Sequence, residues 1–357
     1  MNQLSTICPH FRICSGCTLE KNLQSPSIWE EVKSFLGGAE LVTGQLVHWR
    51  TRAKLAIRGS FKDPKIGLFR AGTHEVEPIP DCQAHHPSIN RAVLLLKEAI
   101  REEKIFIYDE KKGLLRYVQC FVDLATKKVQ LVLVVQANDP SLERLVQRLL
   151  KIDHWHSIWI NVQSAKTNTI LGEEWTHVWG ELFLWQELCG EKIPFHPGAF
   201  AQAHWTLFSE LAERVVDWVP DNSKLLEIYA GVGAMGILAA KKAQSLTLVE
   251  NNPHSYLSFK QLNHSATYHL GDAKAAVSLL ENSDCVIVDP PRKGVDPLLL
   301  ESLQSFSGTL IYVSCDFQSF ARDAEKLLQS GWLLKEAKGY LLFPGTNHVE
   351  TLALFKK

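Results

Sequence analysis

The 357-residue sequence lacks an apolar run of membrane-spanning length, and its first residues lack the basic and apolar blocks of a signal peptide. These absences argue against a transmembrane helix and predict a cytoplasmic location. The formal net charge is only −1, so any affinity for nucleic acid must come from a local patch rather than from the whole molecule. No internal repeat or low-complexity segment is present, and the length allows two globular domains.

Disulfides are not expected for the eight cysteines in a reducing compartment. Cys14 and Cys17 form a CxxC turn, Cys8 lies six residues upstream, and Cys82 is the natural fourth ligand. Four thiolates can bind zinc tetrahedrally or hold an iron–sulfur cluster, and spacing alone favours zinc over the cluster. A chance grouping of cysteines is the alternative. Three others stand singly in apolar runs and are predicted to be core residues: Cys120, Cys189 and Cys285.

Basic residues far outnumber acids between positions 47 and 70. Arg50, Arg52, Lys54 and Arg58 share parity, so an unbroken strand would place them on one face of a sheet. With aromatic residues interleaved, this face could follow a phosphate backbone, or it could be an ordinary solvated surface. Strand-like and helical patterns continue to about residue 190. They predict a β-rich, antiparallel α+β domain over residues 1–190.

Strands and helices alternate over residues 191–357, which predicts a doubly wound, Rossmann-like α/β domain. At its start, the apolar run from Lys224 leads into closely spaced glycines and then a helical pattern. Such a turn holds an adenosine-bearing cofactor, either NAD or S-adenosylmethionine, and an empty glycine-rich turn is the minor alternative. Glu227 favours the methyl donor, because a carboxylate near the turn suits a cationic sulfonium better than a pyrophosphate. Glu250 ends the next strand and is placed to bind a ribose diol.

Three further chemical groups follow strands in the same domain. Asp289 and Cys315 come directly after predicted strands, and Glu350 lies in a predicted C-terminal hairpin. Successive strand ends border one crevice in this topology, so we expect these groups to converge beside the donor. Cys315 is then a candidate nucleophile, although a buried small hydrophobic residue is the alternative. His348 and Glu350 are two positions apart and should share one face of a strand.

These motifs together resemble the S-adenosylmethionine-dependent RNA uracil-C5 methyltransferases. The matching motifs are the Asp289-Pro-Pro-Arg-Lys-Gly segment, Ser314-Cys315, the segment Phe343–Glu350, and Phe200-x-Gln202. The resemblance implies that Cys315 is the nucleophile and Glu350 the base, with donor-site residues Gln202, Tyr229, Glu250 and Asp289. It also implies a [4Fe–4S] cluster on Cys8, Cys14, Cys17 and Cys82, which reverses the preference for zinc.

The layout is similar to that of the short ribosomal-RNA enzymes without an extra N-terminal RNA-binding barrel. The resemblance therefore implies a structured RNA substrate, ribosomal rather than transfer RNA, and we expect a monomer without membrane association. Asp316 and Phe317 stand where relatives have asparagine and proline, and Ala234 replaces an expected asparagine. The alternatives are cytosine-C5 methylation, an RNA-binding protein that has lost catalysis, and an NAD oxidoreductase.

Overall fold

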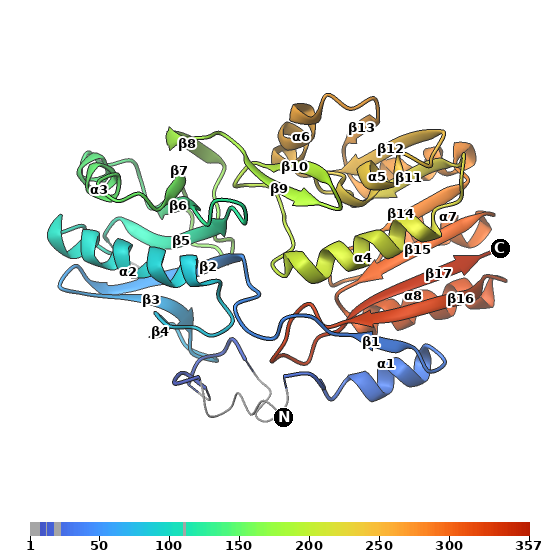
Figure 1. Ribbon diagram of the computed structural model, residues 1–357, viewed down its shortest axis with the longest axis horizontal. Helices are drawn as coiled ribbons and strands as arrows, with labels where there is room; N and C mark the ends of the chain where they lie inside the picture. The colour runs from blue at the N-terminus through green and yellow to red at the C-terminus, as the bar shows by residue number, and fades with distance from the viewer. Residues whose placement is uncertain (1–7, 12, 18–22, 110–111) are drawn as a thin grey trace. The chain divides into compact units, whose positions relative to one another are not determined.

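The computed structural model describes residues 8–11, 13–17, 23–109 and 112–357, and the chain forms two compact units (Figure 1). The first unit comprises residues 1–23 and 46–186, and the second comprises residues 24–45 and 187–357. The sequence-based division at residue 190 differs in two respects, because it assigned residues 24–45 and residues 187–190 to the first domain. None of the helices in the described ranges combines the length and the apolar character needed to cross a membrane.

The first unit is built on a seven-stranded sheet with the order β4-β3-β2-β5-β6-β7-β8. Neighbouring strands are antiparallel except for β6 and β7, which run parallel and are connected by a crossover through helix α3 (Ser141–Leu149). β5 and β6 form an antiparallel hairpin around residues 127 and 128. The strands are β2 (Arg52–Ser60), β3 (Asp63–Phe69), β4 (Val76–Pro78), β5 (Leu115–Val122), β6 (Val129–Val135), β7 (Trp155–Val162) and β8 (Glu174–Gly180).

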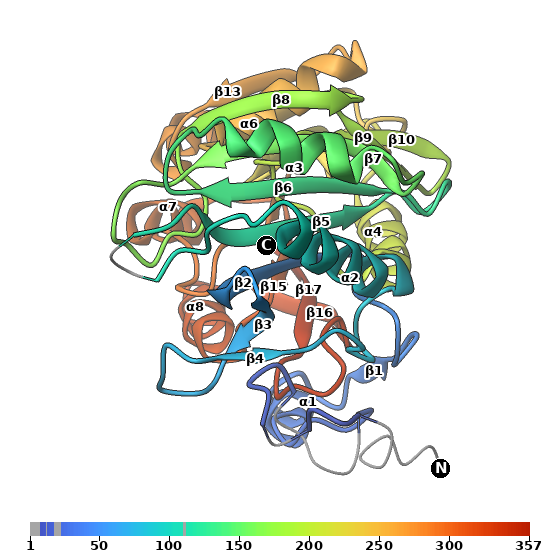
Figure 2. The ribbon, with the colours of Figure 1, turned by 90° about the vertical axis from the view of Figure 1, so that its left-hand side faces the viewer.

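Two helices, α2 (Pro87–Glu102) and α3 (Ser141–Leu149), lie on the same face of this sheet (Figure 2). Their apolar residues, such as Leu96 and Leu145, recur at helical spacing and are fully buried. They pack against alternate strand residues, including Leu55 and Leu133. This layer is the core of the first unit.

The opposite face of the sheet carries the predicted basic residues of β2. Arg52, Lys54 and Arg58 alternate with core residues along the strand, as the parity predicted. Arg50 lies before the strand and forms an isolated bridge with His85, so it is not part of that row. The Arg52 guanidinium lies over the ring of Phe121 at 5.2 Å. This face therefore combines cationic and aromatic side chains.

The second unit contains an eight-stranded sheet with the order β1-β16-β17-β15-β14-β11-β12-β13. The pairs among β11 to β15 are parallel, whereas β17 runs antiparallel to both β15 and β16. The strand order changes direction at β11, where a doubly wound sheet opens a crevice at the carboxyl ends of its strands. The strands are β1 (Glu40–Val42), β11 (Lys224–Ile228), β12 (Ser245–Glu250), β13 (Thr267–Leu270), β14 (Cys285–Val288), β15 (Thr309–Ser314), β16 (Leu333–Tyr340) and β17 (Glu350–Lys356).

Helices cover both faces of this sheet, which confirms the prediction of a doubly wound, Rossmann-like α/β domain (Figure 1). One layer packs α1, α7, α8 and the 3-10 helix η3 against residues such as Ile228, Val288 and Tyr312. A separate two-stranded sheet consists of β9 (Leu184–Leu188) and β10 (Glu191–Phe195). The helical segments are α1 (Trp29–Phe35), α4 (Trp205–Trp218), α5 (Ala234–Ala239), α6 (Pro253–Phe259), η2 (Lys260–Leu262), η3 (Ala273–Asn282), α7 (Pro297–Ser305) and α8 (Phe317–Gln329).

Candidate active site

The glycine-rich turn joins β11 to α5 and is held open by hydrogen bonds to its backbone. Gly231 and Gly233 have φ angles of 55° and 81°, the left-handed region that favours glycine. The Glu250 carboxylate at the end of β12 accepts the Gly231 N–H at 3.0 Å. The Tyr268 hydroxyl donates to the Gly231 carbonyl at 2.7 Å. The turn is thus anchored to the ends of two neighbouring strands.

Glu227 has a different place from the one expected. Its side chain is 1% exposed and does not line the pocket at the strand ends; instead its carboxylate accepts the Gly236 N–H at 2.8 Å. Burial, together with the charges of Asp289 and Glu250, raises the pKa of Glu227 to about 8, while the Gly236 N–H opposes that rise. Glu227 therefore fastens α5 to β11, and the argument that it faces the bound cofactor is wrong.

A pocket of 730 Å³ opens at the carboxyl ends of the second unit's strands. Its size suits a nucleoside-bearing ligand. It brings together all six residues predicted for catalysis and donor binding: Gln202, Tyr229, Glu250, Asp289, Cys315 and Glu350. Sequence reasoning missed other lining residues, although several also follow strand ends: Asn252, Ser255, Asp272, Lys274 and Phe343.

The register of β15 and β17 brings Cys315 beside Glu350. Ser314, the last residue of β15, pairs with Thr351 in antiparallel register, so the next position on each strand is Cys315 and Glu350. Glu350 is the first residue of β17, so His348 is not in the strand as predicted. Both His348 and Glu350 nevertheless line the pocket.

Glu350 is a buried acid without a polar partner. It is 1% exposed, and among the residues that the structure describes neither carboxylate oxygen has a hydrogen-bond partner. Burial, followed by the charge of Asp289, raises the pKa of Glu350 well above its usual value. Burial and the charge of Glu250 likewise raise the pKa of Asp289. Because a buried unpaired carboxylate is costly, the site favours a proton or a cation near this pair.

The Cys315 thiol is held in its protonated form by the same surroundings. Burial, then the charges of Glu350 and Asp289, raise the pKa of Cys315 to about 12, and Arg292 opposes the rise. A positive charge brought into the pocket would lower that pKa by the same electrostatic interaction. The pocket is therefore arranged so that a cationic ligand would favour the thiolate.

Comparison with known proteins connects this geometry to a family. The family model for tRNA (uracil-5-)-methyltransferases matches residues 277–357. An uncharacterized RNA methyltransferase from Protochlamydia amoebophila is 41% identical over 98% of this chain and 97% of that protein. Another, from Geobacter sulfurreducens, is 28% identical over 98% of this chain and 77% of that protein.

A solved structure shows the same relation. The tRNA (uracil-54, C5)-methyltransferase of Pyrococcus abyssi, in complex with S-adenosyl-L-homocysteine, superimposes with a TM-score of 0.81. It is 28% identical, and the match covers 97% of this chain and 86% of that one. The chain belongs to the RNA uracil-C5 methyltransferase family. It is an S-adenosylmethionine-dependent enzyme, which excludes the NAD oxidoreductase and the inactive RNA-binding protein.

The departures from the family pattern have structural explanations at two positions. Asp316 is the N-cap of α8, where its carboxylate accepts the Ser319 N–H at 3.0 Å. Aspartate and asparagine serve this role about equally well. Phe317 packs edge-to-face against Phe35 at 5.6 Å between ring centroids. Ala234 is the first residue of α5, and nothing in the structure explains why alanine stands there.

The segment that carries Gln202 is fixed by residues of α6. The His196 and His254 rings stack with centroids 4.5 Å apart. The Asn252 side chain donates to the Gly198 carbonyl at 3.1 Å. Gln202 itself is 8% exposed and lines the pocket. The Phe200-x-Gln202 motif therefore lies in a loop, and contacts with His254 and Asn252 hold the start of this loop in place.

The four predicted cluster ligands lie in the first unit. Cys14 and Cys82 pack against its hydrophobic core. Burial, followed by the charges of the nearby thiols Cys82, Cys14 and Cys8, raises the pKa of Cys17 to about 11, so Cys17 lies close enough to the other three sulfurs to interact with them electrostatically. Within the described part of the chain, however, no group of three or more His, Cys, Asp or Glu side chains is placed to hold a metal ion. The iron–sulfur assignment therefore stays a prediction.

The buried Glu350 carboxylate gives a prediction about stability. Because its pKa is raised in the folded state, its contribution to stability is fully present below the unfolded pKa of about 4.5 and is lost as the pH rises toward the folded pKa. Glu350→Gln should therefore melt a few degrees above the wild type at pH 8, because the uncharged amide neither takes up a proton nor buries a charge on folding.

The difference in melting temperature should close as the pH approaches 4.5, measured by calorimetry. The exposed Glu325 on α8 provides the control, because Glu325→Gln should not change the melting temperature in this pH-dependent way. Equal melting temperatures of Glu350→Gln and wild type at pH 8 would show that the carboxylate is not destabilising.

Proposed function

We propose that this enzyme methylates carbon 5 of a uridine in a structured RNA through a covalent bond between Cys315 and carbon 6 of the base. The observation that carries the proposal is the Glu350 carboxylate, which is buried, lies next to Cys315 in the pocket and has no hydrogen-bond partner within the described ranges of the chain. A group this costly to bury points to chemistry rather than to support of the fold.

The residues of the pocket match the requirements of the reaction. Carbon 5 of uracil is a poor nucleophile until the Cys315 thiolate adds to carbon 6 and moves electron density onto carbon 5. S-adenosylmethionine, when bound, supplies an electrophilic methyl group to that carbon. Glu350 then removes the hydrogen left on carbon 5, and the electron pair of that C–H bond re-forms the double bond as the Cys315 thiolate leaves. The proton passes from Glu350 to solvent.

Donor binding would involve the acids at the strand ends. We assign Gln202, Tyr229, Glu250 and Asp289 to the donor site because they line the pocket around the glycine-rich turn. Two Glu250 oxygens already accept backbone N–H groups, from Gly231 and from residues 251 and 252, which orients the carboxylate. A cationic sulfonium among these acids would favour the Cys315 thiolate.

The roles of Cys315 and Glu350 can be separated by trapping. Glu350→Gln should still add to the base and methylate it, then remain attached to RNA, because release slows by roughly two to four orders of magnitude without the base. Denaturing electrophoresis should show this adduct, and Cys315→Ala in the same background should abolish it. RNA with 5-fluorouridine should likewise trap the wild type. Near-normal turnover by Glu350→Gln without adduct would remove Glu350 as the base.

RNA recognition is assigned to the first unit on the basis of its basic and aromatic sheet face. Arg58 lies over the rings of Phe69 and Tyr117 at 5.0 and 5.5 Å. Arg52 is buried over Phe121 and donates to the Gln119 side chain at 3.3 Å. Lys54 on the same strand is exposed, so Arg58 and Lys54 are the residues of this row that RNA can reach. Arginine held against an aromatic ring is preorganised to contact phosphates and stack on bases.

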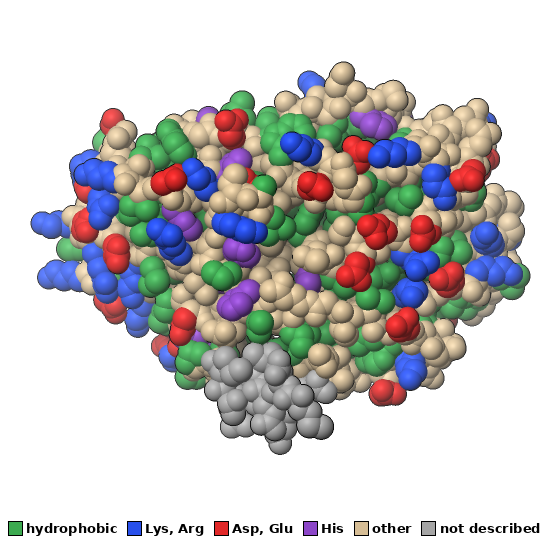
Figure 3. Space-filling model, viewed as in Figure 1, with side chains coloured by type: hydrophobic (Ala, Val, Ile, Leu, Met, Phe, Trp, Pro, Cys, Tyr) green, Lys and Arg blue, Asp and Glu red, His purple; other side chains and the backbone are tan. Residues whose placement is uncertain are grey.

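The helical side of the same unit is a poorer candidate for this contact. Lysines and arginines over α2 and α3 are interspersed with acidic side chains (Figure 3). Arg148 is paired with Glu102, and Arg144 lies 3.7 Å from the Glu103 carboxylate. Charges that are compensated in this way attract a polyanion weakly.

Ribosomal RNA is the predicted substrate, and transfer RNA is the second candidate because the P. abyssi neighbour is a tRNA methyltransferase. Mass mapping of both RNA classes from a strain lacking the gene distinguishes them. The loss of one 5-methyluridine from ribosomal RNA is the expected result. Loss from transfer RNA would transfer the assignment to that class, and loss from neither would contradict the proposed function.

A [4Fe–4S] cluster on Cys8, Cys14, Cys17 and Cys82 is proposed as a structural component of the first unit. The donor set suits it, because four thiols share one region and the Gly16 N–H donates to the Cys14 sulfur at 3.3 Å. The cluster would supply cross-links between the N-terminal segment and the chain near Cys82.

Protein purified without oxygen should therefore contain about four irons per chain and absorb as a cluster. Cys82→Ala should lose the iron and melt at a lower temperature while binding S-adenosylmethionine normally. Cys189→Ser, which changes a cysteine of the second unit, should keep the iron. One zinc and no iron in the anaerobic protein would contradict the cluster.

A further inference from the structure

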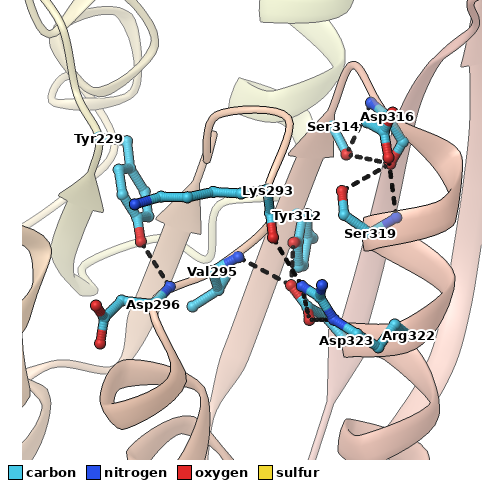
Figure 4. A network of polar contacts seen from close by, with 10 residues as sticks. All are labelled: Tyr229, Lys293, Val295, Asp296, Tyr312, Ser314, Asp316, Ser319, Arg322 and Asp323. Carbon is cyan, nitrogen blue, oxygen red and sulfur yellow. Dashed lines mark hydrogen bonds and ion pairs between the residues drawn. The ribbon is translucent and has the colours of Figure 1, made fainter.

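A network of hydrogen bonds joins α8 to the loop that follows β14 (Figure 4). Its centre is Asp323, which is 0% exposed. One carboxylate oxygen of Asp323 accepts the Val295 N–H at 2.9 Å and the Tyr312 hydroxyl at 2.8 Å. The other accepts two N–H groups of Arg322, at 2.7 and 2.9 Å. Each of the two Asp323 oxygens therefore accepts two hydrogen bonds.

The loop is held at two further points. Arg322 donates to the Lys293 carbonyl at 2.9 Å. The Asp296 N–H donates to the Tyr229 hydroxyl at 2.9 Å. Between these contacts Gly294 has a φ of 84°, and a Cβ there would lie 2.3 Å from Arg322 and 2.5 Å from Asp323. Only glycine allows so close an approach, so the backbone of this loop has a defined position against α8.

The same helix is attached to the candidate nucleophile at its other end. Cys315 immediately precedes Asp316, the N-cap of α8. The Ser314 hydroxyl donates to the Asp316 carbonyl at 3.0 Å, which fixes the turn from β15 into the helix. Helix α8 is thus joined to both sides of the reaction pocket: to Cys315 through its cap, and through Asp323 to the loop that carries Asp289 and Arg292.

We propose that Asp323 is a positioning residue, which sets the place of the Asp289–Arg292 segment relative to Cys315 through its bonds to Val295, Tyr312 and Arg322. Asp323 does not line the pocket, so it acts only through the loop and not on the substrate. The proposal rests on the proposed role of Cys315 as the nucleophile. Covalent catalysis is sensitive to such placement, because a displacement of about 1 Å can cost roughly 10²-fold in rate.

Asp323→Asn tests the role directly. The side chain keeps its size, but its amide group offers one acceptor oxygen in place of two and turns N–H groups toward the donors Val295, Tyr312 or Arg322. The measurement is the rate of covalent capture of 5-fluorouridine RNA at saturating RNA and donor, together with the dissociation constant for S-adenosylmethionine. We expect the saturated rate to fall by roughly 10²-fold, with donor affinity changed by less than about threefold.

Two control variants distinguish positioning from a general loss of stability. Leu327→Ala removes buried packing from the same helix but leaves the hydrogen bonds of Arg322 and Asp323 to the loop in place, so it should lower the melting temperature and leave the saturated capture rate unchanged. Glu325→Gln on the exposed side of α8 should change neither quantity. Tyr312→Phe removes one donor to Asp323, and a smaller rate loss than that of Asp323→Asn is expected; this variant also serves if Asp323→Asn does not fold.

The outcomes also separate this proposal from the proposed function. If the wild type does not capture 5-fluorouridine RNA, the covalent mechanism fails whatever the behaviour of Asp323 variants. If the wild type captures RNA and Asp323→Asn, or in its place Tyr312→Phe, captures it at the wild-type rate, only the positioning role is overturned. A fall in rate that Leu327→Ala reproduces at 25 °C would also overturn it.

Discussion

The direction of β17 is the constraint on which the candidate site depends. Parallel strands bring Glu250, Asp289 and Cys315 to one edge of the sheet because each group follows the carboxyl end of its strand. Strand β17 runs the opposite way between β15 and β16, so its first residue, Glu350, lies at that same edge. A C-terminal strand parallel to β15 would have placed Glu350 at the far edge of the sheet.

This concentration of acids explains the electrostatic character of the pocket. The charge of Glu250 raises the pKa of Asp289, the charge of Asp289 raises the pKa of Glu350, and Glu350 and Asp289 together oppose ionisation of Cys315. Hydrogen bonds from the same region hold the backbone around these acids in place. Glu227 binds the backbone of α5, and Glu250 binds the backbone of the glycine-rich turn. A cationic donor reduces the repulsion, so binding the donor and preparing the thiol are favoured by the same charges.

Much of the site could be predicted from the sequence because it follows the strand-end rule. Gln202, Tyr229 and the three acids all lie in the pocket, although their chemical roles remain predictions. The contact of Glu227 with the backbone of α5 could not be predicted from the sequence. The alternation of side chains along a strand shows which face a residue lies on, but not whether a ligand or a helix covers that face. The pairing of β1 with β16, which places residues 24–45 in the second unit, depends on contacts between segments about 300 residues apart. Local patterns do not specify such a contact.

The fate of the hydrogen on carbon 5 tests the central claim most directly. Substrate RNA made with uridine tritiated at carbon 5 can be incubated with S-adenosylmethionine that carries a labelled methyl group. Attack by Cys315, methylation and removal of the hydrogen by Glu350 predict one tritium released to water for each methyl group transferred, and none with Cys315→Ala. Methyl transfer without release of tritium would contradict reaction at carbon 5.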